Sequence, residues 1–116
     1  MPQQSPASQT GVIVVVEDPL VSRFVGKVLE RAGYPVVEMD PQPALDATRT
    51  GDLPIRILIT NIPHVFVKSA AGIPMLYLAA DPKRELMEGY RRLGVLQKPF
   101  LPSQLLNVVK ELSESR

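Results

Sequence analysis

Short apolar segments alternate along the chain with longer segments of mixed polarity. Residues 12–16 are all apolar and β-branched, which is typical of a strand covered on both faces in a parallel sheet. Similar short segments follow, each bounded by polar, glycine or proline residues. The pattern predicts strands at residues 12–16, 34–39, 55–60, 74–79 and 95–97.

The segment after the first predicted strand begins with a helix-starting signal. Asp18 can cap a helix, Pro19 fits the first turn, and Gly33 provides a stop. Apolar residues recur between these points at helical spacing, and they predict a helix with one apolar stripe. The stripe consists of Leu20, Val21, Phe24, Val25, Val28 and Leu29.

Further helices are predicted from the same kinds of signal. One spans residues 41–50 and ends at Gly51, and another begins at Pro102 and presents an apolar stripe as far as Leu112. A second cap-plus-proline start at residues 81–82 predicts a helix that ends at Gly94. Its buried face would consist of Leu86, Met87, Tyr90 and Leu93.

The segment between the third and fourth predicted strands, residues 62–73, has no clear helical pattern. Pro63 and Gly72 punctuate its ends, and there is little room for a full crossover helix. We expect the helix here, the third in chain order, to be shortened or missing. The sheet face beside it would then be partly bare, and an exposed apolar patch usually marks an interface. This predicts self-association or docking of a partner.

Strands that alternate with helical segments indicate the α/β class. The expected fold is a doubly wound five-stranded parallel sheet with helices on both faces. Residues 11–116 are of the size of a single domain. Residues 1–10 carry no charge and no apolar core, and they predict a flexible tail in place of a secretory signal.

Composition excludes several classes of function. Thirteen basic and twelve acidic residues leave a net charge of +1, so there is no excess of positive charge for binding nucleic acid. The chain has no cysteine, which excludes disulfides and thiolate chemistry and fits a cytoplasmic location. The apolar runs are shorter than the roughly twenty residues that a membrane helix needs.

Polar residues follow most of the predicted strands, where ligands of such sheets bind. Glu17 and Asp18 follow the first strand, and Asn61 follows the third. Ala79 ends the fourth strand, and Lys98 follows the fifth. These five positions are the candidate site.

The candidate site and its surroundings resemble the receiver domain of two-component response regulators. The matching text is VVVEDPLV at residues 14–21, LERAGY at 29–34, LITN at 58–61 and KPF at 98–100. The resemblance spans residues 11 to about 112 and implies a flavodoxin-like receiver fold. It also implies a role in two-component phosphorelay signalling in the cytoplasm. The implied partner is a sensor kinase, an output protein or a second copy of the chain in a homodimer.

The resemblance also implies roles for the candidate residues. Glu17 and Asp18 match the acidic pair that binds Mg²⁺, and Lys98 matches the lysine that pairs with the phosphoryl group. Pro99 is often joined to such a lysine by a cis bond. Val95 falls at a switch position that is aromatic in many members. Ala79 falls where a Thr or Ser contacts the phosphoryl group.

Asn61 stands where the family has its phospho-accepting aspartate. A side-chain amide has no anionic oxygen that could attack a phosphoryl donor. Its loss as an anionic ligand leaves Glu17 and Asp18 with at best a weak Mg²⁺ site, because Mg²⁺ favours carboxylate oxygens. We therefore expect an atypical receiver, not an enzyme, that requires no cofactor and acts through protein contacts without phosphorylation at Asn61.

Each of these residues also has a simpler interpretation. Asp18 can cap the first helix, Lys98 can form an ordinary ion pair with the carboxylates, and Asn61 can satisfy loop hydrogen bonds. The single histidine, His64, lies in the irregular loop and is expected to be exposed. The basic residues Lys83, Arg84, Arg91 and Arg92 form either a solvated surface or a surface that contacts partners.

Two alternatives remain open at this point. The chain could be a conventional receiver that uses another carboxylate, Asp52 or Asp40, as phospho-acceptor. It could also be a small nucleotide- or flavin-binding α/β protein, since fold alone does not fix function. Against the latter, no glycine-rich loop follows the first strand, and no nucleophile and base form a plausible pair.

Overall fold

The structure, a computed structural model, describes residues 11–114, and the predicted tail at residues 1–10 lies outside them. Its strands form one five-stranded parallel sheet in the order β2-β1-β3-β4-β5. The strands are β1 (Val12–Val16), β2 (Val36–Glu38), β3 (Ile55–Thr60), β4 (Met75–Ala79) and β5 (Leu93–Gln97). The helices are α1 (Pro19–Arg31), α2 (Pro41–Thr50), α3 (Val67–Ala70) and α4 (Pro102–Glu114), with 3₁₀ turns η2 (Pro63–Val65) and η3 (Arg84–Leu86).

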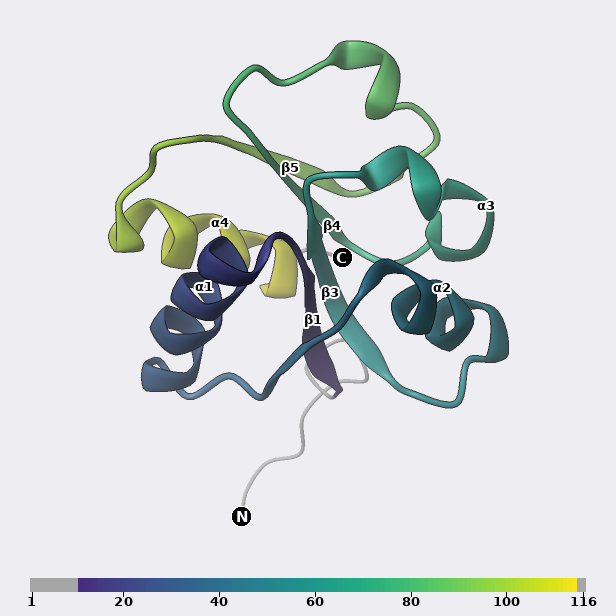
Figure 1. The fold of residues 1–116 in the computed structure, drawn as a ribbon, viewed down its shortest axis with the longest axis horizontal. Coiled ribbons are helices and arrows are strands. Elements are labelled where there is room, and N and C mark those ends of the chain that lie inside the picture. The colour runs from purple at the N-terminus through teal and green to yellow at the C-terminus, as the bar shows by residue number, and fades with distance from the viewer. Residues whose placement is uncertain (1–10, 115–116) are drawn as a thin grey trace.

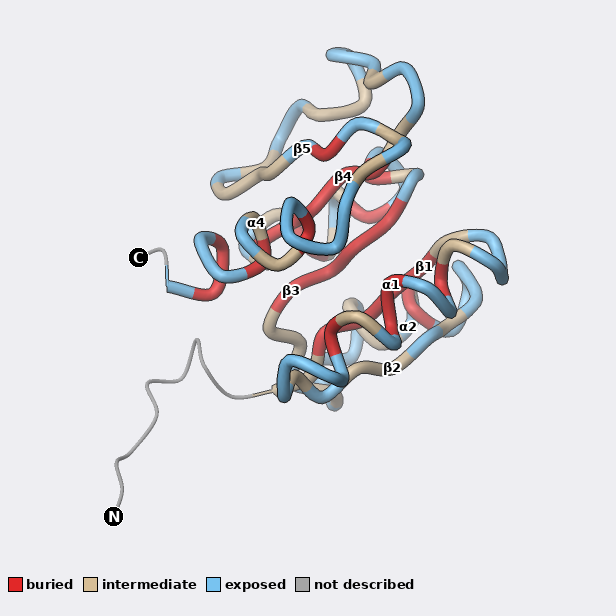
Figure 2. Tube along the Cα trace, turned by 90° about the vertical axis from the view of Figure 1, so that its left-hand side faces the viewer, coloured by how far each residue is buried: buried red, intermediate tan, exposed pale blue. Residues whose placement is uncertain are grey.

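Helices cover both faces of the sheet, and this confirms the predicted doubly wound α/β fold. α1 and α4 lie on one side, which we call face one, and α2 and α3 lie on the other, face two (Figure 1). Successive residues of a strand point to opposite faces, so Ile13 and Val15 join the core of face one while Val14 and Val16 join that of face two. The strands β1, β3 and β4 are buried along most of their length (Figure 2).

The first helix begins as predicted, and its apolar stripe is only partly buried. Asp18 is the N-cap, and its Oδ1 accepts a hydrogen bond from the Val21 amide at 3.2 Å. Val25 and Leu29 are fully buried, whereas Leu20 is 81% exposed and Phe24 is 42% exposed. The predicted apolar stripe is thus only partly buried, because Leu20 and Phe24 lie on a row of the helix that faces solvent.

The expected shortening of the third helix is confirmed, but the expected bare sheet face is not found. α3 has four residues and follows the single turn η2. Phe66 is fully buried and Ala70 nearly so, and both pack in the core of face two. A short helix suffices because these two side chains join the same buried cluster as Leu58 of β3 and Met75 of β4.

The predicted helix over residues 82–93 was wrong. The segment contains only η3 among regular elements, and Leu93 already belongs to β5, where it pairs with Met75. Gly89 adopts a φ of 96°, a left-handed conformation that interrupts a right-handed helix. The helical spacing of Leu86, Met87 and Tyr90 therefore reflects burial within an irregular segment.

Gly94 lies inside β5 and does not end a helix. A Cβ at this position would lie 2.8 Å from Val108 Cγ1 and 3.4 Å from Leu112 Cδ1. The glycine therefore lets α4 pack closely on the edge strand.

Candidate functional site

The candidate residues gather where the strands end, as predicted. The register pairs Val16 of β1 with Thr60 of β3, so Glu17 and Asn61 leave adjacent strands at the same level. At the ends of β4 and β5, the Lys98 amide donates a hydrogen bond of 2.8 Å to the Ala79 carbonyl. β4 and β5 thereby stay joined up to the site.

Glu17 and Lys98 form an ion pair across this edge. Lys98 Nζ lies 2.8 Å from Glu17 Oε2, and the Glu17 side chain is fully buried while that of Lys98 is 25% exposed. Glu17 Oε1 accepts a hydrogen bond from the Asp18 amide at 3.0 Å. The carboxylate is thus neutralised by the lysine, which corresponds to the simpler of the two interpretations of Lys98.

Asp18 and Asn61 take positions at the rim of the site. Asp18 is exposed and its carboxylate caps α1, so part of its hydrogen-bonding capacity serves the helix. Asn61 is exposed. The hydroxyl of the preceding residue, Thr60, accepts a hydrogen bond of 3.1 Å from the Ile62 amide and stabilises the turn.

The remaining candidates lie along β4 and β5. Ala79 pairs with Gln97, and Val95 pairs with Tyr77 and is 39% exposed. The peptide bond between Lys98 and Pro99 is cis, as the resemblance implied. His64 is exposed, as expected.

The two carboxylates at the site already have partners within the protein. Within residues 11–114, no three His, Cys, Asp or Glu side chains lie close enough together to hold a metal ion. Glu17 is bound to a lysine, Asp18 caps a helix, and Asn61 offers a neutral amide where Mg²⁺ favours a carboxylate.

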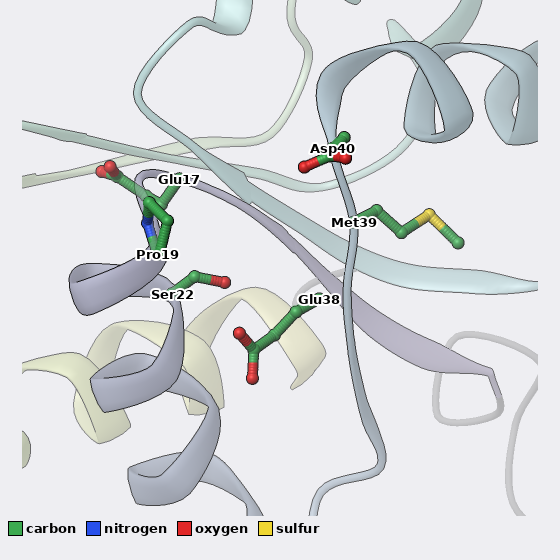
Figure 3. Close-up of a pocket in the computed structure, with 6 residues that line it drawn as sticks. All are labelled: Glu17, Pro19, Ser22, Glu38, Met39 and Asp40. Atoms are coloured by element: carbon green, nitrogen blue, oxygen red, sulfur yellow. The ribbon is translucent and has the colours of Figure 1, made fainter.

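An open pocket of about 230 Å³ lies beside the site, between the start of α1 and the end of β2. Its lining residues are Glu17, Pro19, Ser22, Glu38, Met39 and Asp40 (Figure 3). The carboxylate of Glu17 points away from those of Glu38 and Asp40. Glu38 was not among the residues singled out from the sequence, and Asp40 was considered there only as an alternative phospho-acceptor.

Exposed apolar side chains lie on α1 and on the segment just before α4. Leu20 and Phe24 come from α1, and Leu101, 62% exposed, precedes α4. The rings of Phe24 and Phe100 lie 6.0 Å apart and join the two segments. Arg23, Lys27 and Arg31 are also exposed on α1 at a spacing of four residues, which places them along one row of the helix. We call these residues together the α1 surface.

The described part of the chain, residues 11–114, contains no helix long and apolar enough to cross a membrane.

No protein-family model matches the chain, and no curated protein matches it in sequence. Solved structures do resemble it. Chemotaxis response regulator CheY4 of Vibrio cholerae is 21% identical, with a TM-score of 0.71 over 89% of this chain and 99% of that one. FixJ-N is 15% identical, with a TM-score of 0.77 over 92% and 96% of the two chains.

The receiver domain of sensor histidine kinase PA1611 from Pseudomonas aeruginosa, solved with a magnesium ion in its active-site cleft, is also similar. It is 19% identical, with a TM-score of 0.74 over 90% of this chain and 98% of that one. These matches cover nearly the whole length of each domain. The chain therefore has the fold of response regulator receiver domains.

Proposed function

We propose that the chain is an atypical receiver module of two-component signalling that acts through protein contacts and forms no aspartyl phosphate at Asn61. The observation that carries the proposal is the amide of Asn61 at the end of β3, beside a carboxylate that already pairs with Lys98. The receiver fold supports a signalling role, since the similar structures are receivers.

The chemistry of the site supports the absence of phosphoryl capture. An amide is not a competent nucleophile toward a phosphoryl donor. Lys98 would have to leave a buried carboxylate before it could pair with a phosphoryl group, and the methyl group of Ala79 cannot donate a hydrogen bond to one. We propose that Mg²⁺ binds weakly at most through Glu17 and Asp18, and that the module requires no cofactor.

The two alternative phospho-acceptors, Asp52 and Asp40, lie at other positions relative to the sheet than Asn61. Asp52 precedes β3, at the edge of the sheet opposite to Lys98. Asp40 follows β2, and the sheet order puts β1, β3 and β4 between that strand and β5, which leads to Lys98. Neither aspartate therefore lies at the end of β3, where a conventional receiver has its phospho-acceptor.

The pocket also argues against a nucleotide or flavin. Its volume of about 230 Å³ lies below the roughly 300 Å³ at which pockets for small molecules begin. The carboxylates of Glu38 and Asp40 on its wall would repel the phosphates of such ligands.

We propose that the α1 surface is the docking surface for a protein partner, such as a sensor kinase or an output protein. Leu20, Phe24 and Leu101 supply apolar area. The basic row of α1, Arg23, Lys27 and Arg31, favours an acidic partner surface. Two copies of the chain docked face to face here would bring like charges together, which disfavours a homodimer through this surface. Sedimentation at high protein concentration should therefore show a monomer, and a dimer that Phe24→Ser dissociates would contradict this assignment.

Acetyl phosphate provides the direct test of the proposed function. The wild type and Asn61→Asp are incubated with acetyl phosphate and Mg²⁺, and the intact mass of each is measured. We expect no phosphoryl adduct on the wild type, since the amide cannot be phosphorylated. A stoichiometric adduct on the wild type would refute the proposal, and its loss in the single variant Asp40→Asn would show that Asp40 was the acceptor.

Asn61→Asp tests how much of the site is otherwise competent. An adduct on this variant alone would mean that the amide is the chief obstacle. An adduct on neither protein would mean that the Glu17–Lys98 pair and Ala79 also prevent the reaction.

A further inference from the structure

The connection between β4 and β5 takes the place of a helix on face two. It runs from Ala80 to Arg92 and contains only the single turn η3. We call residues 80–92 the strap. Figure 1 shows it arching beyond the end of β4 and returning close to α3 before β5 begins.

One end of the strap is anchored by Tyr90. Its hydroxyl donates a hydrogen bond of 2.6 Å to the Pro63 carbonyl, and its ring packs against the core of face two. The same carbonyl accepts the Phe66 amide at 3.1 Å, the bond that closes η2. Tyr90 therefore binds directly to the turn that follows Asn61.

A close backbone contact supports this anchor. Gly89 has a φ of 96°, and a Cβ there would overlap the Val67 side chain of α3. Only glycine fits both the conformation and the space. The strap thus lies directly against α3 at this point.

The other end is anchored by a second tyrosine. The Lys83 amide donates a hydrogen bond of 3.2 Å to the hydroxyl of Tyr77, whose side chain is buried in β4. Between the two anchors, Arg84, Glu85 and Glu88 are exposed.

Two further hydrogen bonds tie the ends of the strap to the sheet: Gln97 Nε2 donates to the Ala80 carbonyl at 3.0 Å, and the Met75 amide donates to the Arg92 carbonyl at 2.9 Å. No residue of the strap is fully buried, which is a feature of segments that open locally.

We propose that the strap is a latch that Tyr90 holds closed, and that its opening also releases the turn from Ile62 to Ala70. The Pro63 carbonyl accepts hydrogen bonds both from Tyr90 of the strap and from Phe66 at the end of η2. Displacement of the strap therefore alters the hydrogen bonding of this turn. In a module that takes up no phosphoryl group at Asn61, this coupling would let a partner that contacts the strap alter the loop of the candidate site. The coupling itself does not depend on the proposed function.

Hydrogen exchange of the full chain, followed by mass spectrometry, tests the latch. Tyr90→Phe removes the hydroxyl and keeps the ring. The Pro63 carbonyl then retains only its hydrogen bond from the Phe66 amide. We expect roughly tenfold faster exchange at the amides of Val65, Phe66, Leu86 and Met87, with α1 and α4 unchanged. Tyr34→Phe, on the opposite face, is the matched control and should leave all these amides unchanged.

Three results would overturn the proposal. Faster exchange in the strap alone would show that the turn after Asn61 is not coupled to it. Equal acceleration in α1 and α4 would mark global unfolding, and no acceleration would show that Tyr90 holds nothing closed. Gly89→Ala provides a second route, because it displaces the strap from Val67 and should accelerate the same amides while Tyr90 is intact.

None of these outcomes bears on phosphorylation. The latch could fail while the wild type still forms no adduct with acetyl phosphate, and the reverse result is equally possible.

Discussion

The two faces of the sheet bury their strands equally well but by different means. On face one, α1 and α4 have thirteen residues each, and α1 lies over β1 and β2 while α4 lies over β3, β4 and β5. On face two, α2 has ten residues and α3 only four, and Tyr90 of the strap completes the cover. Nevertheless Val14, Leu58 and Met75 on face two are as fully buried as Ile13, Ile57 and Leu76 on face one. On face two, the side chains of Phe66 and of Tyr90, which is held by one hydrogen bond, thus cover part of the sheet where the helix is short.

Truncation of one core residue on each face tests this equivalence with the largest expected effect. Phe66→Ala on face two should lower the free energy of unfolding by about 4 kcal/mol, because Phe66 is fully buried. Leu105→Ala in α4 should lower it by about 3 kcal/mol for the same reason. Urea denaturation measures both. A loss below about 1 kcal/mol for Phe66→Ala alone would show that face two is loosely packed.

A smaller effect on stability is expected where α4 packs on the edge strand β5. Gly94→Ala would place a methyl group 2.8 Å from Val108 Cγ1, and the resulting overpacking should cost about 1–3 kcal/mol. Gly72→Ala is the matched control, since nothing lies within 4 Å of a Cβ there. Thermal unfolding of both variants is the measurement. Equal stability of the two would mean that α4 can move away from β5 without loss.

The comparison of the two faces also explains which parts of the fold could be predicted from the sequence. Continuous β-branched segments and cap-plus-proline signals depend on local geometry, and they located the sheet and α1. The segment after β4 carries the same signals, at Asp81 and Pro82, and yet forms no α-helix. Its outcome depends on Gly89 against Val67 and on Tyr90 against Pro63, contacts between segments that are distant in the sequence.

The candidate site divides in the same way. The rule that ligand sites lie at the carboxyl ends of parallel strands brought Glu17, Asn61 and Lys98 to one edge. From the sequence, Lys98 could either pair with the carboxylates or contact a phosphoryl group. The choice depends on the distance between side chains that are far apart in the sequence, and this distance cannot be predicted from local patterns. The α1 surface was missed, because Leu20 and Phe24 have the same helical spacing as the buried residues. A row of arginine and lysine at every fourth position, from Arg23 to Arg31, was the available signal.

Helix capping differs between the faces and predicts an effect of about 1 kcal/mol. Asp18 caps α1 through the Val21 amide, whereas Asp40 at the start of α2 makes no side-chain capping bond. Asp18→Ala should therefore cost about 1 kcal/mol of stability, and Asp40→Ala only a few tenths. Urea denaturation of the two variants in parallel gives the difference. Equal losses would mean that general attraction of a carboxylate to the helix N-terminus matters more than the hydrogen bond.

The smallest expected effect concerns Tyr90 at alkaline pH. Burial raises the pKa of Tyr90 above its ordinary value of 10.0. In the unfolded chain the phenol ionises near that value, while in the folded protein it stays protonated, so its contribution to stability is present below pH 10.0 and is lost as pH rises above it. Because Tyr90 is only half-buried, the stability difference between wild type and Tyr90→Phe should shrink by no more than a few tenths of a kcal/mol from about pH 9 to about pH 10.5.

Urea denaturation of both proteins across this range measures the stability difference. Tyr34→Phe, compared with wild type in the same way, shows how much of the change with pH is particular to Tyr90. A difference that grows with pH would mean that the phenolate is stabilised in the fold, and would remove Tyr90 as a neutral donor to Pro63.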